Sequence, residues 1–318
     1  MEYLMVMILL FVAELFYFQV ADRFNIIDRP NERSSHSRIT LRGGGVIFYV
    51  AALFYFIMSG FQYPYFFLGL TMMTLVSFMD DVMTLSNKVR LMVHFLSVGL
   101  LAYELHVFDM PWFMLLVLFV VAVGVINAYN FMDGINGITA AYSLAVCGLL
   151  MWVNKDLNFV DQNLLAYTMI GLGVFTFFNF RKRAKCFAGD VGAVAISFIL
   201  LFALGALIFQ SGNFIYILFL AVYGVDTIWT IVRRLYLREN IFQAHRSHLY
   251  QYLGNEAGVN KLLVSFSYGA SQFLIGWLVI ESANHPVQSQ WLFALGLLSG
   301  MSVFYLVLKS YIIRRFVY

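Results

Sequence analysis

The segment Asn130–Gly137 places a carboxylate and several amides inside an otherwise apolar stretch. It reads Asn-Phe-Met-Asp-Gly-Ile-Asn-Gly, and Asp133 is the only Asp, Glu, Lys or Arg in residues 112–153. A charged group at the centre of a bilayer costs about 2.5–3.5 kcal/mol on insertion scales, so a membrane chain keeps one there for a reason. This segment is therefore the first candidate for chemistry.

Three further carboxylates, Asp80, Asp81 and Asp190, stand at the ends of apolar stretches. The adjacent pair can hold a divalent cation, or one of the two can act as a base beside it. A solvated helix end is the simpler alternative, but carboxylates at a helix C-terminus oppose the macrodipole. Lys88 and Arg90 follow the pair. Asp190 precedes a long apolar helix, where it would serve as an N-cap, a ligand or both.

Basic and imidazole groups occur in two other polar segments. Residues 33–45 are basic, hydroxyl-rich and Gly-rich, and such loops can offer backbone N–H groups to phosphate. A basic loop beside the membrane is the alternative reading. His245 and His248 would lie on one face if helical. Arg246 between them favours contact with phosphate over a zinc site, for which no Cys or His partner lies nearby in the sequence.

The composition is that of a polytopic membrane protein. The 318 residues are 62% hydrophobic and 12% charged, with mean hydropathy +0.81, whereas soluble domains carry about 25% charged residues. The net charge of +3 and the lack of a basic patch interleaved with aromatics argue against nucleic-acid binding. Neither Cys147 nor Cys186 is predicted to form a disulfide or bind a metal.

Apolar stretches predict the helices that must position these groups. A helix needs about 20 apolar residues to cross the hydrocarbon core, and strands are excluded because the apolar runs lack period-2 alternation. The first stretch has no basic n-region, so it is predicted to be retained with the N-terminus outside. About eleven spans are expected: 3–21, 44–60, 64–79, 91–108, 112–129, 136–153, 163–180, 191–210, 213–232, 262–281 and 290–308.

The basic residues set the orientation. With the N-terminus outside, 19 of the 20 Lys and Arg residues fall in inward-facing loops or the C-terminal tail, and only Lys155 faces out. Cytoplasmic loops are the ones rich in Lys and Arg. The sequence therefore predicts an all-α polytopic membrane protein, one domain over residues 1–318, with a cytoplasmic C-terminus. The polar motifs share its cytoplasmic face, in loops 22–43, 80–90, 127–137, 181–190 and 233–261.

The groups on this face indicate a class of substrate. Carboxylates with amides favour a hard divalent ion such as Mg²⁺, the cations and the Gly-rich loop favour phosphates, and the apolar helices favour a lipid. We therefore predict a membrane enzyme that handles a phosphorylated, partly lipidic substrate at the cytosolic surface. A transporter is the competing class, but transporters place polar groups near the midplane, often in repeated halves.

Asp226 is expected to be structural, paired with a basic side chain.

Five motifs in this order resemble the polyprenyl-phosphate N-acetylhexosamine-1-phosphate transferases, over residues 28 to about 252. They are Asp28-x-Pro30-Asn31-x-Arg33-Ser34-Ser35-His36 with Thr40-x-Arg42-Gly43-Gly44-Gly45; Asp80-Asp81 with Lys88 and Arg90; Asn127-x-x-Asn130-Phe131-x-Asp133-Gly134-x-Asn136-Gly137; Phe187-x-Gly189-Asp190-x-Gly192; and His245-x-x-His248. The resemblance implies ten or eleven helices in the bacterial inner membrane with the active site facing the cytoplasm. It also implies a reaction in which undecaprenyl (polyprenyl) phosphate and a UDP-N-acetylhexosamine give polyprenyl-diphosphate-sugar and UMP.

The resemblance also implies roles for individual residues. Asp190 and Asn130 look like ligands of Mg²⁺, with Mn²⁺ as a substitute, and Asp80 or Asp81 looks like the group that deprotonates or orients the lipid phosphate. The remaining side chains would contact substrate: Asn136 and Asp133 the nucleotide, and Lys88, Arg90, Thr40, Arg42, His245, Arg246 and His248 the diphosphate or the sugar. The direct partners are thus both substrates and the bilayer, with a homodimer left open.

Departures from the family pattern narrow the branch. The segment 244–248 reads Ala-His-Arg-Ser-His and lacks the consecutive histidines typical of the peptidoglycan enzyme. This favours the O-antigen or capsule-initiating branch over the muramoyl-pentapeptide transferase, which is kept as the alternative. The sequence leaves the sugar open among GlcNAc, GalNAc, FucNAc and QuiNAc.

Overall fold

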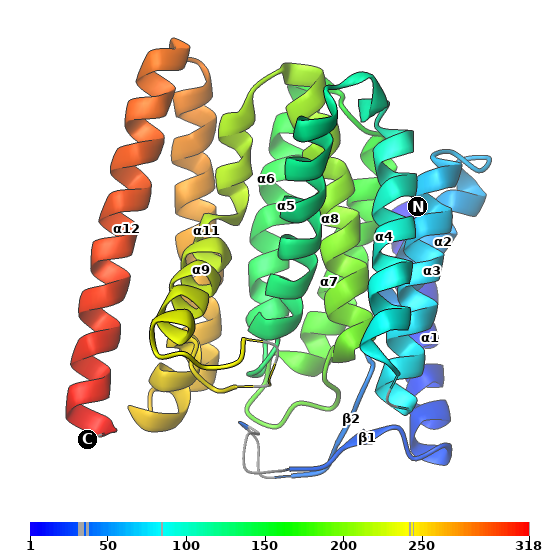
Figure 1. Cartoon of the computed structure of the whole chain (residues 1–318). Coiled ribbons are helices and arrows are strands. Elements are labelled where there is room, and N and C mark those ends of the chain that lie inside the picture. The colour runs from blue at the N-terminus through cyan, green and yellow to red at the C-terminus, as the bar shows by residue number, and fades with distance from the viewer. Residues whose placement is uncertain (31–34, 36–37, 84, 242, 244, 318) are drawn as a thin grey trace.

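The chain forms a bundle of helices (Figure 1), in a computed structural model that describes residues 1–30, 35, 38–83, 85–241, 243 and 245–317. Part of the first motif, Asn31, Arg33, Ser34 and His36, lies outside the described residues. The helices are α1 (Glu2–Arg23), α2 (Val46–Met58), α3 (Pro64–Val82), α4 (Asn87–Glu104), α5 (Trp112–Met132), α6 (Ile138–Leu157), α7 (Gln162–Asn179), α8 (Gly189–Ser211), α9 (Ala221–Tyr236), α10 (Leu249–Gln251), α11 (Lys261–Ala283) and α12 (Val287–Phe316). Shorter elements are η1 (Val107–Asp109), η2 (Phe214–Leu220), η3 (Tyr252–Glu256), β1 (Ile27–Asp28) and β2 (Thr40–Leu41).

Each of the eleven predicted segments coincides with helical structure, although the limits differ, most at the C-terminal helix, which was expected at 290–308 and runs from Val287 to Phe316. The segment expected at 91–108 begins at Asn87, because Ser86 caps it and accepts a hydrogen bond from Val89 N at 3.4 Å. It ends at Glu104, shortly before the left-handed residue His106. The segment expected at 213–232 begins as the 3₁₀ turns of η2 and continues as α9.

The prediction of an all-α polytopic membrane protein is confirmed in its class. Among the described residues, eight helical stretches are long and apolar enough to cross a membrane, and α2 is a shorter apolar helix. The count of eleven spans and the orientation stay predictions. Cys147 and Cys186 are both buried and free.

Helix α8 forms the centre of the bundle. It packs against α2, α3, α5 and α6, and 89% of its most apolar stretch is buried. Because lipid is as apolar as leucine, association of membrane helices depends on close packing of small residues. Here Gly45, at the start of α2, approaches Gly192 of α8 so closely that a Cβ built on Gly45 would lie 2.3 Å from the Gly192 Cα.

Helix α12 lies at the outside of the bundle, beside α11 (Figure 1). Of its 30 residues, the buried ones are Gln290, Tyr305, Lys309 and Ile312. Almost all of its surface is therefore available to lipid. Tyr305 and Lys309, near its C-terminal end, are two polar side chains that point into the protein instead.

The polar motifs gather at one end of the bundle, with β1, β2 and the C-terminus (Figure 1). Strands β1 and β2 pair antiparallel, and the chain after β2 runs beside the segment before α8. Phe187 N donates to Leu41 O at 2.8 Å, and Gly44 N donates to Phe187 O at 2.9 Å. This pairing brings Arg42 to the first turn of α8.

Candidate functional site

Arg42 joins two of the predicted acidic residues. Its Nε lies 2.6 Å from Asp81 Oδ1 and its Nη2 lies 3.2 Å from Asp190 Oδ1. Burial lowers the pKa of the Arg42 guanidinium, but the carboxylates of Asp81, Asp190 and Asp28 outweigh that effect and raise it. Arg42 is thus a fixed positive charge that holds α3 and α8 together at this end of the bundle.

Asp81 caps helix α8 from another helix. Its two carboxylate oxygens accept hydrogen bonds from Asp190 N and Val191 N, each at 3.0 Å. The reading of Asp190 as the N-cap is therefore wrong, because α8 begins at Gly189 and Asp190 lies in its first turn. Gly189 has φ +72, and a Cβ there would lie 2.5 Å from Asp81 Oδ2. Only glycine fits this position without displacing the capping carboxylate.

Arg90 completes the charge network on the other side of Asp190. Its Nη1 lies 2.8 Å from Asp80 Oδ2 and its Nη2 lies 3.7 Å from Asp190 Oδ2. Asp80 Oδ1 also accepts from Leu85 N at 2.8 Å. The side chain of Asp190 remains 21% exposed, whereas that of Asp81 is fully buried. Asp190 is therefore the carboxylate of this network that is best placed to meet a ligand.

A cleft opens beside Asp190. Five of the predicted residues line it, namely Arg42, Asn130, Asp133, Asn136 and Asp190, together with Asp28, Ser35, Gly134, Ile135, Asn179, Phe187, Gly189 and Gln251. The structure thus brings residues from the first, third and fourth motifs to one cavity. Thr40, in β2, and Lys88, exposed on the first turn of α4, are not among its described lining residues.

The Asn130–Gly137 segment comprises the last residues of α5, up to Met132, and the turn to α6, so the predicted turn lies at residues 133–137. Asp133 Oδ1 accepts from Thr139 Oγ1 at 2.6 Å. Burial raises the pKa of Asp133 to about 7; the Thr139 hydrogen bond opposes this, and the nearby Asp190 adds to it. Asn136 Nδ2 donates to Arg181 O at 2.9 Å, so its amide ties this turn to the basic loop after α7.

Asn179, at the end of α7, is a cleft residue that the sequence reasoning missed. Its Oδ1 accepts from Gly137 N at 2.7 Å, and its Nδ2 donates to Cys186 O at 2.8 Å. It therefore links the third and fourth motifs. The sequence did offer a signal for Asn179. It is a polar residue at the inward end of a predicted span, two positions before a run of cations.

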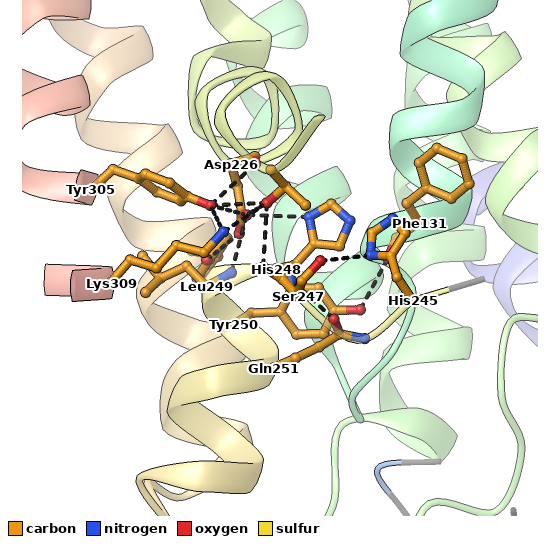
Figure 2. A network of polar contacts seen from close by, with 12 residues as sticks. Phe131, Asp226, His245, Ser247, His248, Leu249, Tyr250, Gln251, Tyr305 and Lys309 are labelled. Atoms are coloured by element: carbon orange, nitrogen blue, oxygen red, sulfur yellow. Dashed lines mark hydrogen bonds and ion pairs between the residues drawn. The ribbon is translucent and has the colours of Figure 1, made fainter. Parts of the chain in front are cut away.

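The histidine segment packs against the same turn (Figure 2). Residues 245–247 are not helical, so the expected helical face is absent there, yet the rings of His245 and His248 have centroids 5.0 Å apart. Burial lowers the pKa of His245 to about 4, and the nearby His248 adds to this. Arg246 lies 3.7 Å from Glu256.

Asp226 is structural and paired with a basic side chain, as expected. Its Oδ1 lies 3.2 Å from His248 Nδ1 and accepts from Leu249 N at 3.1 Å, while its Oδ2 accepts from Tyr268 OH at 2.7 Å. The carboxylate therefore fixes the start of α10 and the His248 ring.

The cleft also supplies donors suited to a hard cation. Asp28, Asn130, Asp133 and Asp190 place carboxylate and amide oxygens along its wall. No group of three or more His, Cys, Asp and Glu side chains arranged for a metal occurs in the described part of the chain. Mg²⁺ commonly takes one or two carboxylates and completes its shell with water and substrate phosphates. The donor set fits an ion of this kind.

Comparisons with known proteins show what the chain is similar to. Residues 63–208, which span α3 to α8, match the glycosyl transferase family 4 model. The chain is 29% identical to the undecaprenyl-phosphate alpha-N-acetylglucosaminyl 1-phosphate transferase of Thermotoga maritima, over 78% of this chain and 80% of that protein. It is 26% identical to the protein of the same description from Yersinia pestis, over 99% and 92%. A probable enzyme of this type from Bacillus subtilis is also 26% identical, over 74% and 71%.

These matches confirm the relationship to the polyprenyl-phosphate N-acetylhexosamine-1-phosphate transferases that the motifs indicated. The match to the family model covers the second, third and fourth motifs, and the similarity to the Yersinia pestis protein extends over nearly the whole chain.

Proposed function

We propose that the protein transfers an N-acetylhexosamine 1-phosphate from a UDP-sugar to undecaprenyl phosphate, and releases UMP. The observation that carries this proposal is the position of Asp190. It lies between the guanidinium groups of Arg42 and Arg90 at the edge of a cleft lined by Asn130 and Asp133. The names of the similar proteins support undecaprenyl phosphate as the acceptor and an N-acetylhexosamine 1-phosphate as the transferred group, and the resemblance of the motifs supports UDP as its carrier.

The chemistry requires placement and charge neutralisation more than it requires a strong base. An ionised oxygen of the lipid phosphate attacks the sugar-bearing phosphorus, and the bond to the UMP oxygen breaks. One diphosphate linkage is exchanged for another, so the step is nearly reversible. Transfer of this kind depends on in-line geometry and on cations beside the equatorial oxygens. Arg42 and Arg90 provide such cations at Asp190.

The two adjacent carboxylates have different parts in this proposal. Asp81 is fully buried, and both its oxygens accept N–H groups of α8, so it holds Asp190 in place. Asp80 pairs with Arg90, so it orients the guanidinium that would meet the phosphates. A direct attack by the lipid phosphate needs no covalent aspartyl intermediate on either residue.

Mg²⁺ is the proposed metal, with Mn²⁺ as a substitute. Asp190 and Asn130 would hold it, and it would neutralise the charge on the transferred phosphate. Asp133 and Asn136 would contact the nucleotide from the turn between α5 and α6. The site faces the cytosol of the bacterial inner membrane in this proposal, because the loops on that face carry almost all of the Lys and Arg residues.

The test is UMP release by the purified protein. It is incubated with undecaprenyl phosphate, Mg²⁺ and a panel of UDP-sugars that includes UDP-GlcNAc and UDP-MurNAc-pentapeptide. We expect UMP from at least one UDP-N-acetylhexosamine, none from the pentapeptide donor, and loss of activity on metal chelation. UMP from the pentapeptide donor alone would place the chain in the muramoyl branch, and no UMP from any donor would refute the proposal.

Asp190→Ala is the variant that tests the centre of the site. We expect it to lower the rate of UMP release by at least about a hundredfold, because both the metal and the two guanidinium groups lose their carboxylate. Asp156→Ala is the matched control, since Asp156 is an exposed carboxylate near the end of α6. Full activity of Asp190→Ala would remove Asp190 from the site.

A further inference from the structure

Two buried polar side chains near the C-terminal end of α12, Tyr305 and Lys309, join the network around the carboxylate that holds His248 (Figure 2). Tyr305 OH donates to Asp226 Oδ1 at 3.1 Å. Lys309 Nζ donates to Tyr305 OH at 2.6 Å and to Thr230 Oγ1 at 3.0 Å. A helix that otherwise faces lipid thus contributes a hydroxyl and an ammonium group to the histidine segment.

Lys309 determines the direction of these hydrogen bonds. An ammonium group only donates, so the oxygens of Tyr305 and Thr230 accept from it and keep their own protons. Those protons are then available to Asp226 Oδ1, which lies 3.1 Å from Tyr305 OH and 3.2 Å from Thr230 Oγ1. The positive charge of Lys309 is separated from the buried Asp226 carboxylate by only these two hydroxyls. It therefore offsets the negative charge and stabilises the ionised form of Asp226 in a low-dielectric site.

An ionised Asp226 fixes the tautomer of His248. A carboxylate can only accept, so His248 Nδ1, 3.2 Å away, carries the proton. In the neutral ring Nε2 is then a lone-pair acceptor. The His248 side chain is 2% exposed, and Nε2 has no hydrogen-bond partner among the described residues. A buried nitrogen with an unused lone pair is costly to keep, which points to a ligand group that donates to it.

His248 is not among the described lining residues of the cleft, but it contacts residues that lie beside it. Its ring stacks near Phe131, with centroids 6.5 Å apart, and the next aromatic residue, Tyr250, donates to Phe131 O at 3.0 Å. Gln251 lines the cleft, and its Oε1 accepts from His248 N at 3.1 Å. The histidine is therefore held against the chain segment that carries Asn130 and Asp133.

We propose that Tyr305 and Lys309 of α12 are positioning residues that hold Asp226 ionised and thereby present His248 Nε2 as a hydrogen-bond acceptor to the UDP-sugar. The inference rests on the proposed transfer reaction. The ligand group is a hydroxyl or amide N–H of the donor substrate, since those groups donate to an imidazole nitrogen. The lipid phosphate is excluded as its partner, because an ionised phosphate offers no proton.

Two conservative variants test this assignment. Tyr305→Phe removes one hydroxyl, and Lys309→Met removes the charge while keeping an unbranched apolar chain of similar length. Each is expected to lower kcat/KM for the UDP-sugar about tenfold, the effect of one lost hydrogen bond to a charged group. The KM for undecaprenyl phosphate should stay unchanged. If α12 only stabilised the fold, the two substitutions would lower the fraction of active enzyme and leave both KM values unchanged.

The same helix offers matched controls. Arg315 and Tyr311 form a hydrogen-bonded pair on the exposed side of α12. Tyr311→Phe and Arg315→Met therefore repeat the two chemical changes away from Asp226, and should leave kcat/KM unaltered. If Lys309→Met does not fold, Tyr305→Phe carries the kinetic test alone. Kinetics of Tyr305→Phe and Lys309→Met equal to those of their controls would overturn the proposal.

A spectroscopic measurement separates this inference from the proposed reaction. The protein has six histidines, so ¹⁵N-histidine NMR spectra of the wild type and His248→Gln identify the His248 signals. We expect a neutral ring protonated on Nδ1 in the wild type, and a mixture of tautomers in Tyr305→Phe. A wild-type ring protonated on Nε2 would overturn the positioning role even in an active enzyme. Failure of all UMP release would refute the proposed reaction and leave the tautomer measurement intact.

Discussion

At the scale of single residues, adjacent carboxylates in the sequence take separate structural roles. Asp80 pairs with Arg90, while Asp81 turns to the backbone of α8 and to Arg42. The hydrogen bond that Asp190 N donates to Asp81 Oδ1 joins residues 109 positions apart. Substitution of either residue is expected to abolish activity, but the loss at Asp81 would come through the displaced helix start. Activity data alone therefore do not identify a catalytic base here.

The raised pKa of Asp133 predicts a pH-dependent gain of stability in Asp133→Asn. Because burial raises this pKa to about 7, the ionised carboxyl destabilises the folded state. That cost is absent below the unfolded pKa of about 4, grows as the pH rises from about 4 towards the folded pKa of about 7, and keeps its full size above it. Asparagine keeps the acceptor for Thr139 without the charge. We expect thermal unfolding in detergent to show a gain of about 2–4 °C at pH 8 and a smaller gain at pH 5.

The exposed Asp109→Asn is the control for this comparison, and its unfolding temperature should match the wild type at both pH values. An equal shift of Asp133→Asn at pH 5 and pH 8 would show that the charge of Asp133 is not what destabilises the turn. A loss of stability at pH 8 would contradict the raised pKa.

The residue types of the site were predictable from the sequence, but their pairing was not. Hydropathy marked Asp133 and Asp190 because a carboxylate in an apolar stretch stands out. The capping of α8 by Asp81 could not be predicted from the sequence, since Asp190 itself has a side chain suited to capping a helix. Asn179 was overlooked because one amide at a helix end is unremarkable until its two partners, Gly137 and Cys186, are seen.

At the scale of elements, the first turns of α2 and α8 are in direct backbone contact. Gly45 N donates to Ala188 O at 3.1 Å, and added Cβ atoms at Gly45 or Gly192 would lie within 2.5 Å of the opposite backbone. This contact fixes the start of α8, and hence Asp190, relative to Arg42. Gly45 belongs to the Gly-rich segment that was predicted to offer N–H groups to phosphate, and the structure gives this glycine a packing role.

Gly45→Ala is therefore expected to weaken both stability and activity. Overpacking of a tight contact costs about 1–3 kcal/mol, and the displaced α8 would carry Asp190 away from its guanidinium partners. Thermal unfolding and UMP release should both fall. Gly124→Ala in α5 is the matched control, because a Cβ there meets nothing within 4 Å. Wild-type behaviour of Gly45→Ala would mean that the two helix starts can separate without consequence.

At the scale of the whole molecule, the sequence predicted the course of the chain better than its packing. Long apolar stretches and the distribution of Lys and Arg located the helices and placed the five motifs together. The central position of α8 and the outer position of α12 were not predictable, because both helices are strongly apolar, with hydropathy of 2.7 and 2.0. In lipid, hydrophobicity does not distinguish a buried helix face from an exposed one.

Orientation is the property of the whole molecule on which the cytosolic site depends, and chemical labelling can test it. The native cysteines are both buried, so new cysteines report on their own positions. Asp156→Cys lies in the last turn of α6, before the connection to α7, and Arg183→Cys lies in the basic loop between α7 and α8; both positions are exposed. A membrane-impermeant maleimide added to right-side-out spheroplasts should label Asp156→Cys at once and Arg183→Cys only after permeabilisation.

This result follows from the positive-inside rule, since Arg183 has three basic neighbours within two positions on either side. The reverse pattern would place Asp190 and its cleft outside the cell, where no UDP-sugar is available, and would refute the proposed reaction at its most general level.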